Sequence, residues 1–276
     1  MKRRNTQTPV VDIAAMIFAV LIFIIPFYFI VLNSLKDRRE AGLMNLNWPE
    51  VLHFENYLEV ISTQNYMILR AFVNSVIITA GSIVLLIVVC ALGGYIMQRL
   101  SSKFMTGVNF LILTGLMLPP AILPTIWVMD LIGIYRSLFG MILVEVALNI
   151  PFTTMLYRGY TASIPREIEE AAYVDGCSSL RLFAQIIFPL LLPVTATVVV
   201  LSSVNIFNDF VNPLYFLPGG KNPTVQLTLY NFMGRYASSW NLLFADVVLI
   251  TIPPLVLFIF FNRKIVSGIT AGAVKG

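Results

Sequence analysis

The chain has 276 residues, of which 58% are hydrophobic and 12% charged, and its mean hydropathy is +0.85. So little polar surface cannot enclose the apolar side chains in a soluble globule, and the composition therefore predicts an integral membrane protein. The net charge of +4 comes from cations near the expected membrane boundaries, so it gives no reason to expect a nucleic-acid partner.

The chain contains six apolar runs that are long enough to cross a bilayer as helices. A helical span needs about 20 apolar residues to cross roughly 30 Å of hydrocarbon. The runs are too long for barrel strands and lack their apolar and polar alternation, so we expect an all-α integral membrane protein with six transmembrane helices. In chain order, the expected spans are 11–32, 72–97, 108–132, 138–155, 183–207 and 242–261.

Two of these spans contain clustered prolines. Pro119, Pro120 and Pro124 interrupt the third span, and Pro253 and Pro254 interrupt the sixth. Because proline lacks the N–H of a helical hydrogen bond, we expect broken or bent helices at both places.

The distribution of Lys and Arg predicts the orientation. Cytoplasmic loops carry an excess of these residues. With six spans and a cytoplasmic amino terminus, this excess falls inside, and both chain termini lie in the cytoplasm. The cations placed inside are Lys2, Arg3, Arg4, Arg99, Lys103, Arg158, Arg166, Arg181, Arg263, Lys264 and Lys275.

The charged segment between the fourth and fifth spans has the pattern of a helix, a turn and a second helix. Its first helix begins with acids, which suit a helix amino terminus. Ile168, Ala171, Ala172 and Asp175 follow at helical spacing and give one narrow face, and Gly176 fits a left-handed cap. Such a small apolar face beside a carboxylate suits a groove on another protein, although an ordinary loop between two spans is the alternative.

The spacing of this segment is also a motif. Glu170-Ala171-Ala172 is followed by three residues, Gly176, nine residues, Ile186, one residue, Phe188 and Pro189. This resembles the EAA motif of membrane subunits of ATP-binding-cassette importers, with Phe188 in place of leucine. The resemblance extends over nearly the whole chain, looks closest to the carbohydrate, maltose-type permeases, and departs from them at Phe207-Asn208, where Trp-Asn is usual. The supporting stretches are 33–36, 56–57, 72–75, 119–120, 164–165 and 268–276.

The resemblance implies a permease subunit and the partners around it. These are a second related permease, two cytoplasmic ATPase subunits and an extracytoplasmic solute-binding protein, assembled in the lipid bilayer of a bacterial or archaeal plasma (inner) membrane. It implies contact with the ATPase through a coupling loop at about 158–182 of this single transmembrane domain. The residues assigned to that contact are Arg166, Glu170, Ala171, Ala172, Asp175 and Gly176.

We expect no enzymatic activity, metal site or cofactor on this chain. It has no phosphate-binding G-x-x-x-x-G-K-[ST] loop, since Gly219-Gly220-Lys221 lacks the first glycine and continues with Asn222. ATP and Mg are therefore expected on the partner ATPase. The resemblance also implies that the carboxyl-terminal tail, about 263–276, reaches the ATPase, with a disordered end as the alternative.

Polar residues inside the spans give a second group of candidates, because such groups at membrane depth commonly mark pathways or partner contacts. Hydroxyl and amide groups suit a sugar, and interhelical hydrogen bonding is the alternative. The possible translocation pathway comprises Glu145, Asn149, Asn205, Asn208 and Asp209.

Two other functions compete with an importer subunit. A secondary transporter or channel would carry a proton on Glu145 or Asp246, but such carriers often have repeated halves and no convincing internal repeat is found. A membrane scaffold without transport activity disagrees with the motif spacing.

Overall fold

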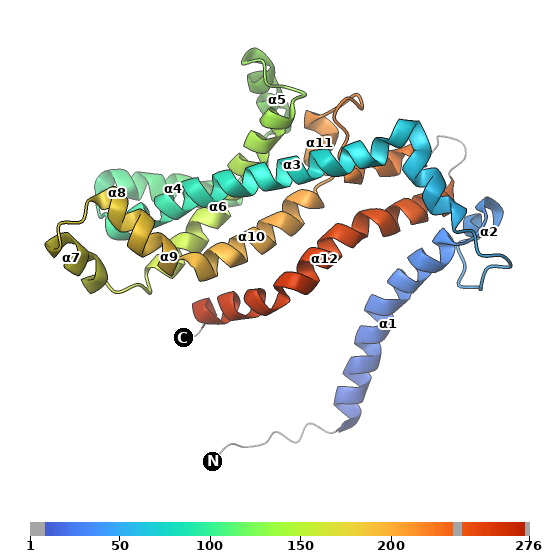
Figure 1. Cartoon of the computed structure of the whole chain (residues 1–276), viewed down its shortest axis with the longest axis horizontal. Coiled ribbons are helices and arrows are strands. Elements are labelled where there is room, and N and C mark those ends of the chain that lie inside the picture. The colour runs from blue at the N-terminus through green and yellow to red at the C-terminus, as the bar shows by residue number, and fades with distance from the viewer. Residues whose placement is uncertain (1–8, 234–238, 274–276) are drawn as a thin grey trace. The chain divides into compact units, whose positions relative to one another are not determined.

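The computed structural model describes residues 9–233 and 239–273 (Figure 1), without the side-chain surroundings of 9, 10, 257, 258 and 260–273. Every regular element within the described ranges is helical, as the sequence predicts. The chain forms two compact units. Residues 1–69 with 228–252 make up the first, and residues 70–227 with 253–276 make up the second.

Membrane-spanning length is reached by three described helices, or five elements if each bent pair counts as one span. The three are α1 (Pro9–Ser34), α3 (Glu55–Arg99) and α6 (Leu138–Thr161). The backbone of α3 is non-helical at residues 63–66, so a kink divides this element into a short and a long helix. The bent pairs are α4 (Lys103–Met117) with α5 (Ile122–Leu131), at 118°, and the segment Ser179–Leu190 with α10 (Leu192–Phe207), at 71°. The apolar part of α12 (Trp240–Ala273) is the shorter stretch Trp240–Val256.

The prolines act differently in the two places where the sequence predicts breaks. The break between α4 and α5 contains Pro119 and Pro120, which confirms that expectation. By contrast, α12 continues as one helix through Pro253 and Pro254 to Ala273, so the helix is not broken there. Each proline removes only one N–H donor, and the flanking turns keep their helical backbone. The helix also covers residues 263–273 of the expected tail, and residues 274–276 lie outside the described ranges.

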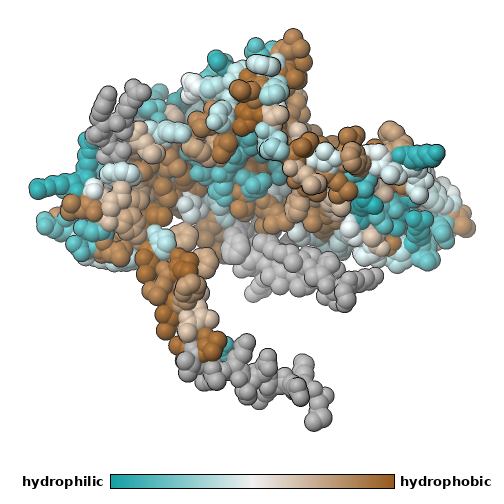
Figure 2. Space-filling model, turned by 180° about the vertical axis from the view of Figure 1, so that it is seen from behind, coloured by the Kyte–Doolittle hydropathy of each residue, from teal (hydrophilic) through white to brown (hydrophobic). Residues whose placement is uncertain are grey.

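The first unit contains α1, α2 (Arg38–Gly42) and the start of α3. Nearly all of α1 is exposed, including Phe18 and Phe23 at 66% and 67%, and it appears as an apolar column in Figure 2. Only its end packs, where Phe29 meets the ring of Phe244 edge-on at 5.4 Å. A helix that is apolar all round and exposed belongs in lipid or against another membrane protein.

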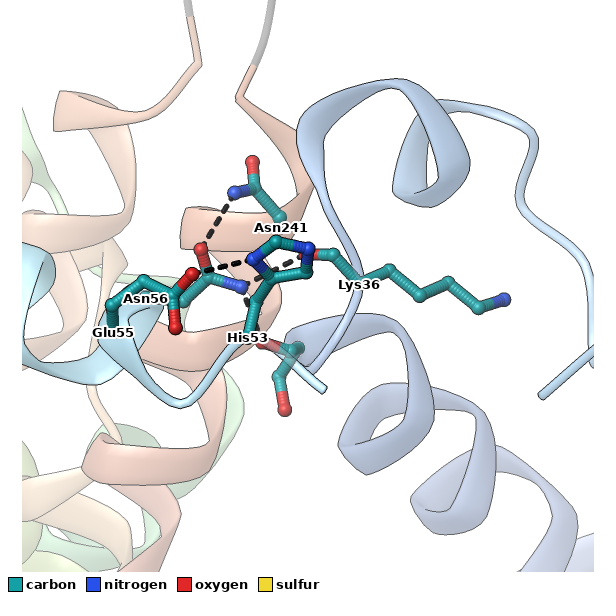
Figure 3. A network of polar contacts seen from close by, with 6 residues as sticks. Lys36, His53, Glu55, Asn56 and Asn241 are labelled. Atoms are coloured by element: carbon teal, nitrogen blue, oxygen red, sulfur yellow. Dashed lines mark hydrogen bonds and ion pairs between the residues drawn. The ribbon is translucent and has the colours of Figure 1, made fainter. Parts of the chain in front are cut away.

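Buried polar contacts hold the loop after α1. The Lys36 ammonium donates to Asn33 Oδ1 at 3.0 Å and to the Asn45 carbonyl and Oδ1 at 2.8 and 2.9 Å. Burial lowers the pKa of Lys36, although nearby Glu40 opposes the shift. Asn56 donates to the Lys36 carbonyl and accepts from Asn241 at 2.9 Å (Figure 3). The resemblance stretches 33–36 and 56–57 therefore build one polar scaffold.

Two other polar residues of the first unit, His53 and Asp246, also have close partners. Figure 3 shows His53 beside Glu55, with 2.5 Å between Nδ1 and Oε1. Asp246 is fully buried and accepts a hydrogen bond from Thr228 at 2.8 Å. The local polar contacts therefore give both His53 and Asp246 structural partners.

The second unit is a group of packed helices in which α6 contacts α4, α10 and α11 (Val211–Phe216). Its core contains Leu86, Met141, Tyr157 and Leu191, each with no measurable exposure. The helix α7 (Glu167–Val174) lies at one end of this group, and α11 lies toward the other (Figure 1). The two groups of sequence candidates therefore occupy different ends of one unit.

The polar groups of the second expected span make contacts between elements. Asn74 donates to the Pro223 carbonyl at 2.9 Å, and the Ser75 hydroxyl accepts from the N–H of Val225 at 3.1 Å. Val225 begins η2 (Val225–Asn231), a 3₁₀ helix. Asn74 and Ser75 therefore join α3 to the loop at Pro223 and to the start of η2.

Candidate functional site

The candidate coupling segment forms the helix and cap that its sequence predicts. Three acids occupy the first turn of α7, and Gly176 follows the helix with φ +76°. Its N–H donates to the Tyr173 carbonyl at 3.0 Å, and the N–H of Cys177 donates to the Ala172 carbonyl at 3.0 Å. This pair of bonds is a Schellman cap, which favours glycine at the position with positive φ.

A buried ion pair anchors α7 to the end of α3. Arg99 Nε donates to Glu169 Oε1 at 2.6 Å, and both side chains are 11% exposed. Glu169 Oε2 accepts from the Tyr95 hydroxyl at 3.0 Å, while Arg99 also donates to the Ile164 carbonyl at 2.8 Å. Breaking such a pair leaves a buried charge uncompensated, so these contacts fix the position of α7 strongly.

The sequence did not identify this anchor. Glu169 is one of three acids in the same turn, and its partner Arg99 lies 70 positions earlier. The available signal was the helical phase: Glu169 shares the face of Ala172, three residues later. That face packs inward, whereas Glu167 and Glu170 are exposed.

The outward face of α7 differs from the expected one. Ala172 is 6% exposed and packs, with Ile168 against it, in the core of its own chain. Glu170, Ala171 and Asp175 are exposed, and so are Tyr173 and Val174, at 51% and 87%. The expected face of Ile168, Ala171, Ala172 and Asp175 is therefore wrong as a single surface, because its members divide between packing and exposure.

A π-helical turn follows the loop. After α8 (Ser179–Leu182), the segment η1 (Phe183–Ile187) is π-helical and leads into α9 (Phe188–Leu190). Pro189 cannot donate to the carbonyl four residues earlier, and a wider turn before it accommodates that loss. Phe188, which replaces the usual leucine, packs against Phe183 with ring centroids 6.2 Å apart. The phenylalanine that departs from the motif therefore makes an aromatic contact inside the chain.

The candidate pathway residues divide into an exposed group and a closed group. Asn205 on α10 donates to Asn149 Oδ1 on α6 at 3.1 Å, and Asn149 donates to the Glu145 carbonyl at 2.8 Å. Asn208 ends α10 and accepts from Gln226 at 3.2 Å. Asn205 and Asn208 are exposed, so their amides can also reach a ligand outside the helix group.

Glu145 and Asp209 belong to the closed group. Both line a cavity of about 10 Å³, and Glu145 is 2% exposed. Ligand pockets measure about 300–1,000 Å³, so this cavity does not hold a sugar. Asp209 accepts from the N–H groups of Val211 and Asn212 and from the Asn212 side chain, at 2.9, 3.2 and 2.6 Å. Asp209 therefore holds the turn into α11.

Phe207, the residue that replaces the usual tryptophan, lies beside this cavity. It is 4% exposed and packs against Phe72 with ring centroids 6.5 Å apart. The substitution therefore keeps an aromatic side chain in the wall between α3 and α10.

These helices and the loop define an inner-membrane protein that crosses the bilayer several times. A family model described as "binding-protein-dependent transport system inner membrane component" matches residues 2–271. The chain belongs to this family. It is a permease subunit of an ATP-binding-cassette importer, not the ATPase.

Relatives and a solved structure match along nearly the full length. The melibiose/raffinose/stachyose import permease protein MelC of Bacillus subtilis (strain 168) is 32% identical over 99% of both chains. The probable starch degradation products transport system permease protein AmyC of Thermoanaerobacterium thermosulfurigenes is 32% identical, covering 92% of this chain and 93% of the relative. A crystal structure of a bacterial transporter that imports the polysaccharide alginate has a TM-score of 0.79 and 19% identity, covering 95% and 98% of the two chains.

Proposed function

We propose that this permease imports a sugar or oligosaccharide, with ATP hydrolysis on its partner subunits coupled to transport through α7. In the proposed complex, the chain pairs with a second related permease and two cytoplasmic ATPase subunits. An extracytoplasmic binding protein delivers the substrate. Family membership and the EAA spacing at Glu170, Ala171, Ala172 and Gly176 support this proposal.

The observation that best supports the coupling role is that one face of α7 packs against its own chain and the opposite face is exposed. Glu169 and Ala172 hold the helix to its own chain, through the ion pair with Arg99 and through core packing. Glu170, Ala171 and Asp175 remain exposed beside Tyr173 and Val174. A short helix fixed in this way can transmit the movement of a partner to α3 and α6, because interfaces shift as packed bodies.

We propose six spans with both termini in the cytoplasm. The broken pairs would each count as one span, and α12 would supply the sixth. Arg99, Arg158 and Arg166 lie around one cavity at the α7 end of the second unit, which agrees with a cytoplasmic position. A reporter fused after Gly276 is therefore expected to be active only in the cytoplasm, and extracytoplasmic activity would refute this topology.

The substrate class rests on two observations. Relatives of this chain are named for melibiose, raffinose and stachyose, for starch degradation products and for arabinooligosaccharides. Exposed amides of Asn205 and Asn208 suit hydroxyl-rich, uncharged ligands, because an amide both donates and accepts hydrogen bonds. Glu145 is assigned to helix packing instead, because it is buried in a cavity too small for a sugar ring.

The experiment is uptake of raffinose, stachyose and starch-derived oligosaccharides by proteoliposomes that contain the whole complex. We expect uptake to require ATP and the binding protein, with no response to a proton gradient alone. Glu170→Lys should abolish uptake because it reverses an exposed charge at the ATPase contact. Asp130→Lys makes the same charge change at an exposed position on α5 and serves as the control. Gradient-driven uptake by this chain alone, unaffected by Glu170→Lys, would replace the importer with a proton-coupled carrier.

A further inference from the structure

A polar cavity of about 290 Å³ opens where α3 ends and α4 begins. Its lining combines the end of α3, the turn at Ser101 and Ser102, the start of α4 and side chains from Arg158 and Arg166. All of these residues belong to the second unit. The volume is at the lower end of the range for ligand pockets, about 300–1,000 Å³, and suits a small headgroup.

The cavity carries an excess of positive charge. Three arginines and no acidic residue line it, and among the carboxylates of the described residues Glu169 pairs with Arg99. Arg158 donates to the neutral amide oxygens of Gln98, at 3.4 Å, and Asn109. Within the described residues, neither Arg158 nor Arg166 is within ion-pair distance of a carboxylate. Two guanidinium charges are therefore available to an anion.

The donors in the cavity match a phosphate group in kind. Guanidinium groups present paired N–H donors that fit phosphate oxygens. Ser101 and Thr106 add hydroxyls, and α4 starts at the lining residues with its amino terminus, where anions are favoured. Ser102 already caps this helix by accepting from the N–H of Met105 at 3.1 Å.

The helix α4 also offers an apolar surface that continues from the cavity. None of its residues is buried, although its start lines the cavity. On the face of α4 that contains the cavity-lining Asn109, the following turns expose Leu113 and Leu116 at 40% and 47%. Met117 follows them at 85%. A ligand with a phosphate at one end and hydrocarbon at the other fits a cationic cavity followed by an apolar helix face. Anionic membrane lipids have this chemistry.

We propose that the cavity lined by Arg158 and Arg166 binds the phosphate group of an anionic phospholipid, whose acyl chains lie along α4. The site requires a chain inserted in a bilayer, but it requires neither the proposed sugar nor the coupling role of α7. Arg166 is also one of the residues that the resemblance assigns to the ATPase contact, whereas Arg158 is not. Arg158→Gln alone should therefore weaken lipid binding without removing a residue assigned to that contact.

The test uses the purified importer complex in mixed phosphatidylglycerol and phosphatidylcholine nanodiscs, released and examined by native mass spectrometry. Arg158→Gln/Arg166→Gln should retain about tenfold less phosphatidylglycerol, since charge-assisted hydrogen bonds are lost, with unchanged phosphatidylcholine. Arg38→Gln/Arg181→Gln removes two exposed cations elsewhere and should retain lipid as the unaltered complex does. Equal loss in both double variants, or no loss in either, would overturn the site.

Two further arms address the source of the phosphate and the folding of the variant. Millimolar inorganic phosphate should not displace phosphatidylglycerol from the complex. If inorganic phosphate displaces the lipid, and this depends on Arg158 and Arg166, the cavity is a site for free phosphate instead. The exposed Arg166→Gln alone should lower phosphatidylglycerol retention if the double variant does not assemble. The proposal would be contradicted if an assembled Arg166→Gln complex bound phosphatidylglycerol normally and only misassembled protein lost the lipid.

Discussion

Glu169 on α7 and Glu145 on α6 are both buried acids of the same unit, but their surroundings differ. Glu169 contacts a guanidinium and a phenol, and it joins α7 to the end of α3. Glu145 shares a small cavity with Asp209, and its Oε1 has no hydrogen-bond partner in the described part of the chain. A buried acid that pairs with a cation thus anchors two elements to each other. A buried acid inside a span is not a pathway residue by its position alone.

The largest effect is expected from breaking the Arg99–Glu169 anchor. Glu169→Ala leaves Arg99 buried without its partner, and such a loss costs about 3–5 kcal/mol. ATP-driven uptake should fall more than tenfold, and trypsin should cut the α7 loop faster. Glu167→Ala removes an exposed acid from the same turn and should preserve both properties.

A double replacement sharpens this comparison. Arg99→Leu/Glu169→Leu removes both charges, so it should destabilise the loop less than Glu169→Ala does. If Glu169→Ala and Glu167→Ala behave alike in uptake and proteolysis, the ion pair does not position α7.

A smaller effect is expected at the cap of α7. Gly176 has φ +76°, where a β-branched residue is strained by roughly 1–2 kcal/mol. Gly176→Val should therefore reduce uptake and ATPase association several-fold while membrane insertion persists. Gly176→Asn is the matched control, because asparagine tolerates this conformation better. Equal uptake by the two variants would show that the cap does not matter for coupling.

The smallest effect is expected in the exposed polar group. Removing the bond between Asn205 and Asn149 with Asn205→Ala should cost about 0.6 kcal/mol in stability, the average for such contacts in membranes. A thermal-unfolding cycle with Asn149→Ala measures this coupling. If the amides also contact sugar, the KM for uptake should rise with little change in kcat, and an unchanged KM would restrict Asn205 to packing.

Local features were predictable from the sequence, and long-range ones were not. The helix, the turn at Gly176 and the break at Pro119 depend on neighbouring residues, so their sequence signals were sufficient. The inward face of α7 depends on contacts with α3, and this is why Ala171 and Ala172 could not be distinguished beforehand. In α12, the helix continues through Pro253 and Pro254, although the local preference of proline favours a break.

The central claim is that the exposed side of α7 contacts the ATPase. Cysteine cross-linking tests it directly in the assembled complex, with Cys177→Ser to remove the nearby native thiol. Ala171→Cys should cross-link to the ATPase subunit, and the yield should change with ATP. Ala172→Cys is the adjacent control, because this position packs inside its own chain and should give little product. Absence of ATPase cross-links from Ala171→Cys, or a stronger product from Ala172→Cys, would contradict the account.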